Sequence, residues 1–280
     1  MKYAAKGAAL VDFGMRRAPG PVAPLRAARG AQMAGFAATS NLSAARQLKF
    51  RSSGTMAHSY IQAHENEEKA FLDFSRLYGD QTILLVDTYD CREGIRKAAR
   101  AAAALEGESG VRIKGIRIDS GDLEELSKYA RQYFDEQQLA YLHIFVSGSL
   151  DEYAIRDLLE NNAPIDGFGV GTRLAVSRHV PATDIAYKLI RYSDRGVSKD
   201  SPGKETLPHR KSIVRHEGEG GTFAGDTIQR YPVDGDLLTG FAGPEGMETI
   251  RERINTQLDS FDSSVLRIRK PADYAVDFRM

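Results

Sequence analysis

The sequence has little of what marks secreted, membrane-spanning or cysteine-rich proteins. It contains one cysteine, Cys91, and no tryptophan, so it forms no internal disulfide and holds no cysteine-rich zinc module. Its longest apolar runs, such as residues 101–105, are far shorter than the roughly 20 residues that a membrane span needs. Residues 1–10 lack the apolar core of a signal peptide, and we therefore expect a cytoplasmic protein.

An excess of charge of either sign is also missing. The chain has 38 basic and 38 acidic residues, which argues against broad binding to nucleic acids or anionic membranes but allows a local phosphate site. Apolar residues make up 42% of the 280 positions. That is enough to bury a sizeable core, in one large domain or in a domain with an appendage.

What is present is an alternation of short apolar segments with longer amphipathic ones. Strands are predicted at residues 9–13, 83–86, 111–118, 142–146 and 165–168, and a weaker one at residues 48–51. Helical periodicity covers residues 71–78, 95–105, 123–134 and 153–159. Such alternation predicts a parallel sheet with right-handed crossovers. About six strands fit a barrel-like or open α/β sheet and not a complete eight-stranded barrel.

The composition changes near residue 190, after which the chain is polar and rich in lysine, proline and glycine. We therefore expect an α/β catalytic domain at residues 1–190 and a small β-rich appendage at residues 191–280. Within the appendage, residues 213–215 and 227–231 are candidate strands, and residues 247–258 have the pattern of a helix.

Chemically active side chains follow the predicted strands. Arg16 and Arg17 come after the first strand, His58 after the second, Asp87 after the third and Asp119 after the fourth. Glycine-rich turns follow the fifth and sixth strands. Because the loops after parallel strands face one cavity, this inventory suits a substrate that carries phosphates and a diol.

Each feature also has a simpler explanation. Residues 149–152 and 122–125 match helix capping boxes, and a single glycine such as Gly148 commonly serves a tight turn. His58 alone would be an ordinary histidine, and the histidines show no metal-ligand spacing, so no metal cluster is predicted. Two glycine turns at neighbouring strand ends nevertheless favour an anion cradle. A carboxylate at a strand end lowers stability unless it is paired or is solvated in a functional cavity.

Five motifs, in order along the chain, resemble those of nicotinate phosphoribosyltransferases. They are residues 12–18 (DFGMRRA, resembling DFGxRRA), 54–59 (GTMAHS, resembling GTxAHS), 85–90 (LVDTYD), 115–123 (GIRIDSGDL, resembling GxRxDSGDL) and 168–172 (FGVGT). The resemblance implies an α/β fold, the incomplete TIM-like barrel of type II phosphoribosyltransferases. It implies condensation of nicotinate with 5-phosphoribosyl 1-pyrophosphate (PRPP) to nicotinate mononucleotide and pyrophosphate, in NAD salvage. In the family this reaction is coupled to ATP hydrolysis and needs Mg²⁺.

The resemblance also implies roles for individual residues. His58 matches the histidine that ATP phosphorylates, Thr55 and Arg117 match nicotinate-binding positions, and Asp119 matches a residue that holds the ribose hydroxyls or Mg²⁺. The positions that match PRPP-binding residues are Arg16, Arg17, Gly148, Gly169, Gly171 and Thr172.

Members of the family commonly carry a β-rich N-terminal region that supplies an aromatic residue to stack on the pyridine ring. This chain begins almost at the first motif, so we expect that region to be missing. We expect small-molecule substrates, no nucleic-acid or membrane partner, and a homo-oligomer or an association with a separate N-terminal chain. The alternative is a catalytically inactive, truncated remnant that binds phosphate ligands or a partner chain.

Overall fold

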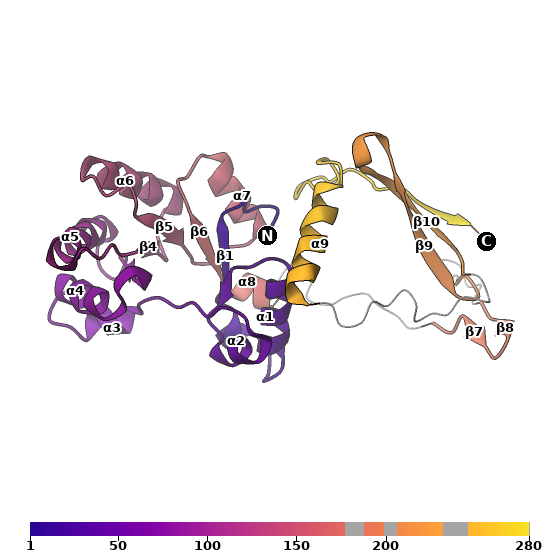
Figure 1. The fold of residues 1–280 in the computed structure, drawn as a ribbon, viewed down its shortest axis with the longest axis horizontal. Coiled ribbons are helices and arrows are strands. Elements are labelled where there is room, and N and C mark those ends of the chain that lie inside the picture. Colours follow the sequence, from indigo (N-terminus) through magenta and orange to yellow (C-terminus); the bar gives the residue numbers. More distant parts are fainter. Residues whose placement is uncertain (177–187, 199–205, 232–245, 280) are drawn as a thin grey trace. The chain divides into compact units, whose positions relative to one another are not determined.

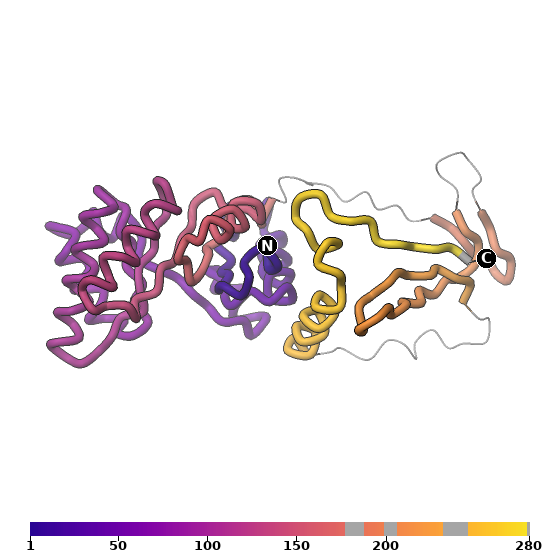
Figure 2. Tube along the Cα trace, turned by 90° about the horizontal axis from the view of Figure 1, so that it is seen from above, coloured from indigo at the N-terminus to yellow at the C-terminus, as the bar shows by residue number. Residues whose placement is uncertain are grey.

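A computed structural model describes residues 1–176, 188–198, 206–231 and 246–279. The chain divides into two compact units, Met1–Pro181 and Ala182–Met280, which are drawn in Figures 1 and 2. Within the described residues, none of the helices is both long enough and apolar enough to cross a lipid bilayer.

The first unit is built around a six-stranded parallel sheet in the order β2-β1-β6-β5-β4-β3, which curls as an open half-barrel in Figure 1. This confirms the incomplete α/β barrel that the sequence predicts. The strands are β1 (Ala9–Asp12), β2 (Ala38–Thr39), β3 (Ile83–Leu85), β4 (Gly115–Ile118), β5 (His143–Val146) and β6 (Gly167–Val170). The helical elements of this unit are η1 (Met15–Arg17), α1 (Ala23–Met33), α2 (Leu42–Leu48), α3 (His58–Gln62), α4 (Glu67–Tyr78), η2 (Gly79–Gln81), α5 (Cys91–Ser109), α6 (Leu123–Glu136), α7 (Glu152–Glu160) and α8 (Thr172–Ala175).

Local sequence signals explain where the long helices begin. The side chain of Asp90 accepts a hydrogen bond of 2.8 Å from the backbone N–H of Glu93 at the start of α5. Asp122 accepts one of 3.0 Å from the N–H of Glu125 at the start of α6, as its capping pattern predicts. Helices α5 and α6 pack on β4, and α4 packs on α5.

Side chains along each strand alternate between the helix-covered face of the sheet and the opposite face. In β1, Leu10 is 1% exposed, whereas its neighbours Ala9 and Val11 line a cavity. Phe168 of β6 is fully buried, and its neighbour Gly169 reaches the same cavity. The apolar core therefore lies on the helix-covered face, and the other face is open to a ligand.

Two local predictions are wrong. Residues 48–51 do not form a strand, because the side chain of Asn41 caps α2, which continues to Leu48, and Lys49 then adopts a left-handed φ of 50°. The second strand of the chain is β2, which pairs with β1 and whose two residues are too few to show a pattern. Ser149 does not cap α7 either, since it lies in the turn after β5 with a φ of 50°, and Asp151 caps the helix instead.

The second unit contains the β-rich appendage and the helix that its sequence predicts. Strand β10 (Phe223–Arg230) pairs antiparallel with β9 (Lys211–Glu217) and parallel with β11 (Val276–Arg279). The short strands β7 (Arg191–Tyr192) and β8 (Arg195–Gly196) form a separate hairpin. The other elements are η3 (Glu219–Gly221) and α9 (Met247–Asp259).

Candidate active site

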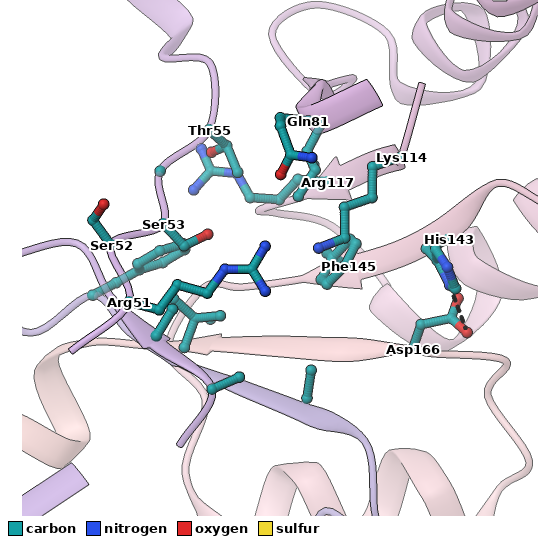
Figure 3. Close-up of a pocket in the computed structure, with 18 of the residues that line it drawn as sticks. Arg51, Ser52, Ser53, Thr55, Gln81, Lys114, Arg117, His143, Phe145 and Asp166 are labelled. Carbon is teal, nitrogen blue, oxygen red and sulfur yellow. Dashed lines mark ion pairs between the residues drawn. The ribbon is translucent and has the colours of Figure 1, made fainter. Parts of the chain in front are cut away.

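A cavity of about 720 Å³ lies on the open face of the sheet. All six strands of the sheet contribute to its wall, together with residues 51–55 (Figure 3). Three of the residues predicted from the sequence line it: Thr55, Arg117 and Gly169.

Arg117 is the most informative side chain of the cavity. Its guanidinium carbon lies 5.7 Å from the centre of the Phe13 ring, and its Nη2 donates a long hydrogen bond of 3.4 Å to the carbonyl of Met56. Its Nε–H is buried without a hydrogen-bond partner among the described residues. Burial lowers the pKa of Arg117, while the carboxylates of Asp119 and Asp87 act in the opposite direction. The side chain therefore offers an unused charged donor beside an aromatic ring.

The Phe13 ring occupies its place because β6 has glycine opposite it. A Cβ atom on Gly169 would lie 2.4 Å from the Phe13 ring, so a larger residue there would displace the ring. Gly169 thus lies inside β6 and makes room for the aromatic wall of the cavity.

Two further cations face the cavity and were missed by the sequence analysis. Arg51 and Lys114 both point into it in Figure 3. Lys114 Nζ lies 5.5 Å from the centre of the Phe145 ring, and neither cation forms an ion pair within the described residues. Because an anion would relieve the repulsion between unpaired cations, the cavity favours a negatively charged ligand.

A second group of predicted residues lies at the carboxyl ends of β3, β4 and β5. His58 Nδ1 is 3.0 Å from the hydroxyl of Thr88, and His58 Nε2 is 3.9 Å from Asp119 Oδ2. Ser147 donates a hydrogen bond to the other oxygen of Asp119. Asp87 Oδ2 accepts a hydrogen bond of 3.2 Å from the backbone N–H of Asp119. The sequence predicted His58 and Asp119 as site residues, and the structure adds Thr88 and Ser147 as their partners.

The glycine turn after β5 is pressed against this polar cluster. Gly148 has a φ of 98°, and a Cβ atom there would lie 2.2 Å from the carbonyl oxygen of Asp119. Only glycine fits both the backbone angle and the space. Gly148 therefore fixes the turn beside Asp119.

The arginine turn and the last glycine turn lie together at the ends of β1 and β6. Arg16 and Arg17 are exposed and form no ion pair within the described part of the chain. A Cβ atom on Gly14 would lie 3.2 Å from the carbonyl oxygen of Gly171. Thr172 follows Gly171 as the first residue of α8. Two turns predicted to bind PRPP are thus neighbours.

Within the described ranges, no group of three or more His, Cys, Asp or Glu side chains is arranged to hold a metal ion. Asp87 and Asp119 nevertheless present carboxylate oxygens at adjoining strand ends, and Asp87 Oδ1 is buried without a partner among the described residues. Mg²⁺ commonly binds through one or two carboxylates together with substrate phosphates. This donor set fits a cation that arrives with a phosphorylated substrate.

Comparison with known proteins shows which family the chain belongs to. Residues 8–193 match the model of the nicotinate phosphoribosyltransferase (NAPRTase) family. The chain is 48% identical over 228 residues to nicotinate phosphoribosyltransferase pncB2 of Mycobacterium tuberculosis, and 39% identical over 229 residues to nicotinate phosphoribosyltransferase of Bacillus subtilis. These alignments cover 81% and 76% of this chain but 48% and 46% of the relatives. The chain therefore spans about half the length of these curated relatives.

Solved structures agree on the fold. Human nicotinic acid phosphoribosyltransferase matches with a TM-score of 0.74 at 21% identity, over 99% of this chain and 70% of that one. Nicotinate-nucleotide pyrophosphorylase from Pyrococcus furiosus matches with a TM-score of 0.72 at 23% identity, over 92% of this chain and 67% of that one. From its motifs, the family match and these relatives, the chain belongs to the nicotinate phosphoribosyltransferase family.

Proposed function

We propose that this chain provides the catalytic site that condenses nicotinate with PRPP to give nicotinate mononucleotide and pyrophosphate, a cytoplasmic step of NAD salvage. The observation that carries the proposal is the buried Nε–H of Arg117 beside the Phe13 ring, which has no hydrogen-bond partner among the described residues. A guanidinium prefers a carboxylate that it can bind with two parallel hydrogen bonds, and the ring offers a face on which a flat heterocycle can stack. Within the described ranges, the hydroxyl of Thr55 makes only a long bond of 3.4 Å to the carbonyl of Met56, so it can turn toward that carboxylate.

PRPP is proposed to bind along the carboxyl ends of the strands. Backbone amides of the turns at Gly148 and at Gly171 and Thr172 are suited to the 5′-phosphate. Arg16 and Arg17 are exposed cations beside the second of these turns and suit the pyrophosphate.

The chemistry needs little beyond this arrangement. Displacement of pyrophosphate from C1 of the ribose passes through an oxocarbenium-like state, and the ring nitrogen of nicotinate is the nucleophile. No protein nucleophile is required, so positioning, neutralisation of the leaving group and exclusion of water supply the rate. Asp119 is proposed to hold the ribose hydroxyls.

ATP is proposed to couple to the reaction by phosphorylating His58. A phosphoryl group there would add negative charge and acceptor oxygens beside Asp119 and could reorder the neighbouring loops. Mg²⁺ would be held by Asp119 and Asp87 together with substrate phosphates, and it would neutralise the charge on those phosphates.

The active form is proposed to be a homo-oligomer, or an assembly with a separate chain. The support is the six-stranded sheet, which curls as an open half-barrel (Figure 1). Light scattering of the purified chain, alone and mixed with a separately produced N-terminal portion of a relative, tests this proposal. The proposal would be contradicted if the chain were fully active as a monomer and did not bind the added N-terminal portion.

The test of the proposed function is the reaction itself. The full chain is incubated with nicotinate, PRPP, ATP and Mg²⁺, and nicotinate mononucleotide is quantified by chromatography. We expect Arg117→Ala to raise the KM for nicotinate strongly, since the substrate carboxylate loses a charged partner worth about 2–5 kcal/mol. Arg112→Ala is the matched control, because Arg112 is exposed and pairs with Glu106.

Calorimetry with nicotinate and PRPP separates the alternatives. Binding without product, in the chain and in its assemblies, would favour the inactive remnant that binds phosphate ligands. A folded chain that neither binds these substrates nor forms product would overturn the proposed function.

A further inference from the structure

Thr88 makes a contact with His58 that none of the sequence motifs assigns to it. Thr88 lies just after β3, and its hydroxyl oxygen is 3.0 Å from His58 Nδ1. A threonine hydroxyl can either donate to a bare ring nitrogen or accept from a protonated one. The distance alone therefore leaves the tautomer of His58 open.

The other ring nitrogen decides between these two arrangements. His58 Nε2 lies 3.9 Å from Asp119 Oδ2. A bare Nε2 would direct its lone pair at a carboxylate and would be repelled, whereas an Nε2–H is attracted to it. Electrostatics therefore places the hydrogen on Nε2. Nδ1 is then the bare nitrogen, and Thr88 must be the donor.

The carboxylate that favours this tautomer is itself held in place. Ser147 donates a hydrogen bond to Asp119 Oδ1, and the backbone N–H of Asp119 donates one of 3.2 Å to Asp87 Oδ2. The first bond holds one oxygen of the carboxylate, and the second holds the backbone from which the side chain extends, so the carboxylate stays directed at the histidine. The imidazole of His58 is thus held from both sides, by Thr88 and by Asp119.

We propose that Thr88 is a positioning residue whose hydroxyl donates to His58 Nδ1. This bond holds the ring as the Nε2–H tautomer, with the lone pair of Nδ1 directed at the Thr88 hydroxyl. The tautomer rests on the two distances, from His58 Nδ1 to Thr88 and from His58 Nε2 to Asp119, and on the negative charge of Asp119. Its consequence rests on the proposed function, in which ATP phosphorylates His58.

That consequence concerns the phosphoryl transfer. The Nδ1 lone pair forms the new bond to the γ-phosphorus of ATP, the bond from that phosphorus to the β–γ bridging oxygen breaks, and ADP leaves with the electron pair. No proton has to be removed, because Nδ1 carries none. Attack from Nε2 would instead require that nitrogen to lose its hydrogen first, because in this tautomer only Nδ1 has a free lone pair. The Thr88 hydroxyl must rotate off Nδ1 as the phosphoryl group arrives.

The test reads the tautomer directly. The full chain, labelled with ¹⁵N-histidine, is studied by two-bond ¹H–¹⁵N correlation spectra at about pH 8.5, above the usual histidine pKa of about 6.5. His58→Asn assigns the signals of His58. Thr88→Val removes the hydroxyl with little change of shape, and Thr88→Ser restores it.

We expect the Nε2–H pattern, with a hydrogen-bonded Nδ1, in the wild type and in Thr88→Ser. In Thr88→Val the Nδ1 signal should move, and the ratio of the two tautomers should fall roughly fivefold, as the loss of one hydrogen bond implies. A wild-type spectrum with the hydrogen on Nδ1, or identical His58 signals in the wild type and Thr88→Val, would overturn the proposal.

A second readout separates this proposal from the proposed function. The rate at which ATP phosphorylates His58 should fall in Thr88→Val and recover in Thr88→Ser, with the Kd for ATP unchanged. If no variant is phosphorylated while the tautomer spectra behave as expected, the ATP coupling fails and the role of Thr88 stands. An equal phosphorylation rate in the wild type and Thr88→Val would contradict the role of Thr88 in the transfer.

Discussion

Asp12 and Thr39 are joined by a hydrogen bond of 2.8 Å, in which the Thr39 hydroxyl at the end of β2 donates to Asp12 Oδ2 at the end of β1. The second oxygen of Asp12 accepts a bond of 2.8 Å from the backbone N–H of Gly14. Asp12 is only 1% exposed, so these two donors replace the water that a carboxylate requires. The turn that leads to Arg16 and Arg17 is thereby tied to the neighbouring strand.

This relationship predicts the effect of Thr39→Val. The substitution keeps the shape of the side chain but leaves one oxygen of a buried carboxylate without its donor. We expect the free energy of unfolding to fall by about 1.5–3 kcal/mol, measured by urea unfolding followed by circular dichroism. Thr39→Ser keeps the hydroxyl and should lose clearly less. Equal stability of the two variants would show that the hydrogen bond contributes nothing.

Gly148→Ala should disrupt the turn beside the His58 cluster. The alanine would have to adopt a φ of 98°, and its Cβ atom would lie 2.2 Å from the carbonyl oxygen of Asp119. The turn after β5 must therefore move away from the end of β4. Replacing glycine by alanine at a position that tolerates it raises the free energy of unfolding by roughly 0.4–1 kcal/mol, and here we expect a decrease larger than that. We also expect weaker binding of PRPP, measured by calorimetry.

The matched control is Gly107→Ala in α5, where a Cβ atom meets nothing within 4 Å. That change should leave PRPP binding intact and stabilise the helix by roughly 0.5–1 kcal/mol. If Gly148→Ala and Gly107→Ala bind PRPP with the same affinity, the role assigned to Gly148 is refuted.

The sequence could predict the strands and helices whose patterns are long or fully apolar. All three residues of β3 are buried, and α5 is both capped and rich in alanine, so local signals and tertiary structure agree. It failed at residues 48–51, where a helix cap at Asn41 outweighs a short apolar pattern, and at β2, which is defined only by its pairing with β1. Pairing with a distant strand leaves no local signal.

The residues of the candidate site also fall into those that the sequence could predict and those that it could not. Residues inside motifs, such as Arg117 and His58, could be named from the sequence alone. Arg51 and Lys114 could not, because a single cation in a loop or before a strand looks like any solvated charge. Only the curl of the sheet brings them to one cavity. Thr88 lies inside a motif, but its partner is 30 residues away.

Cys91 should be unusually slow to alkylate. Burial raises the pKa of its thiol to about 12, with further contributions from the carboxylates of Asp87 and Asp90, and only the thiolate reacts. Near neutral pH, iodoacetamide should modify the folded chain at least about a hundredfold more slowly than the chain unfolded in guanidinium chloride, where the pKa is about 8.5. Since the chain has one cysteine, its mass reports this site alone, and similar rates in the two states would contradict the raised pKa.

Glu67 should make the protein less stable as the pH rises. The side chain is 1% exposed and pairs with Lys97 at 3.0 Å, while its other oxygen is buried without a partner among the described residues. Burial raises the pKa of Glu67 above 4.5, and the pairing with Lys97 only partly opposes this. The folded state therefore keeps the proton to higher pH than the unfolded state does, so the free energy of unfolding declines as the pH rises from about 4.5 through the folded-state pKa.

Glu67→Gln should remove this decline, and urea unfolding at a series of pH values measures it. The neighbouring Glu68 provides a control of opposite sign, because its hydrogen bond to Arg100 lowers its pKa. Glu68 stabilises the fold above the unfolded-state pKa and loses that contribution as the pH falls, so Glu68→Gln should remove a rise of stability with pH. Because the two positions are adjacent at the start of α4, a general effect of losing a charge would move both profiles in one direction, and only burial of Glu67 predicts opposite changes of slope.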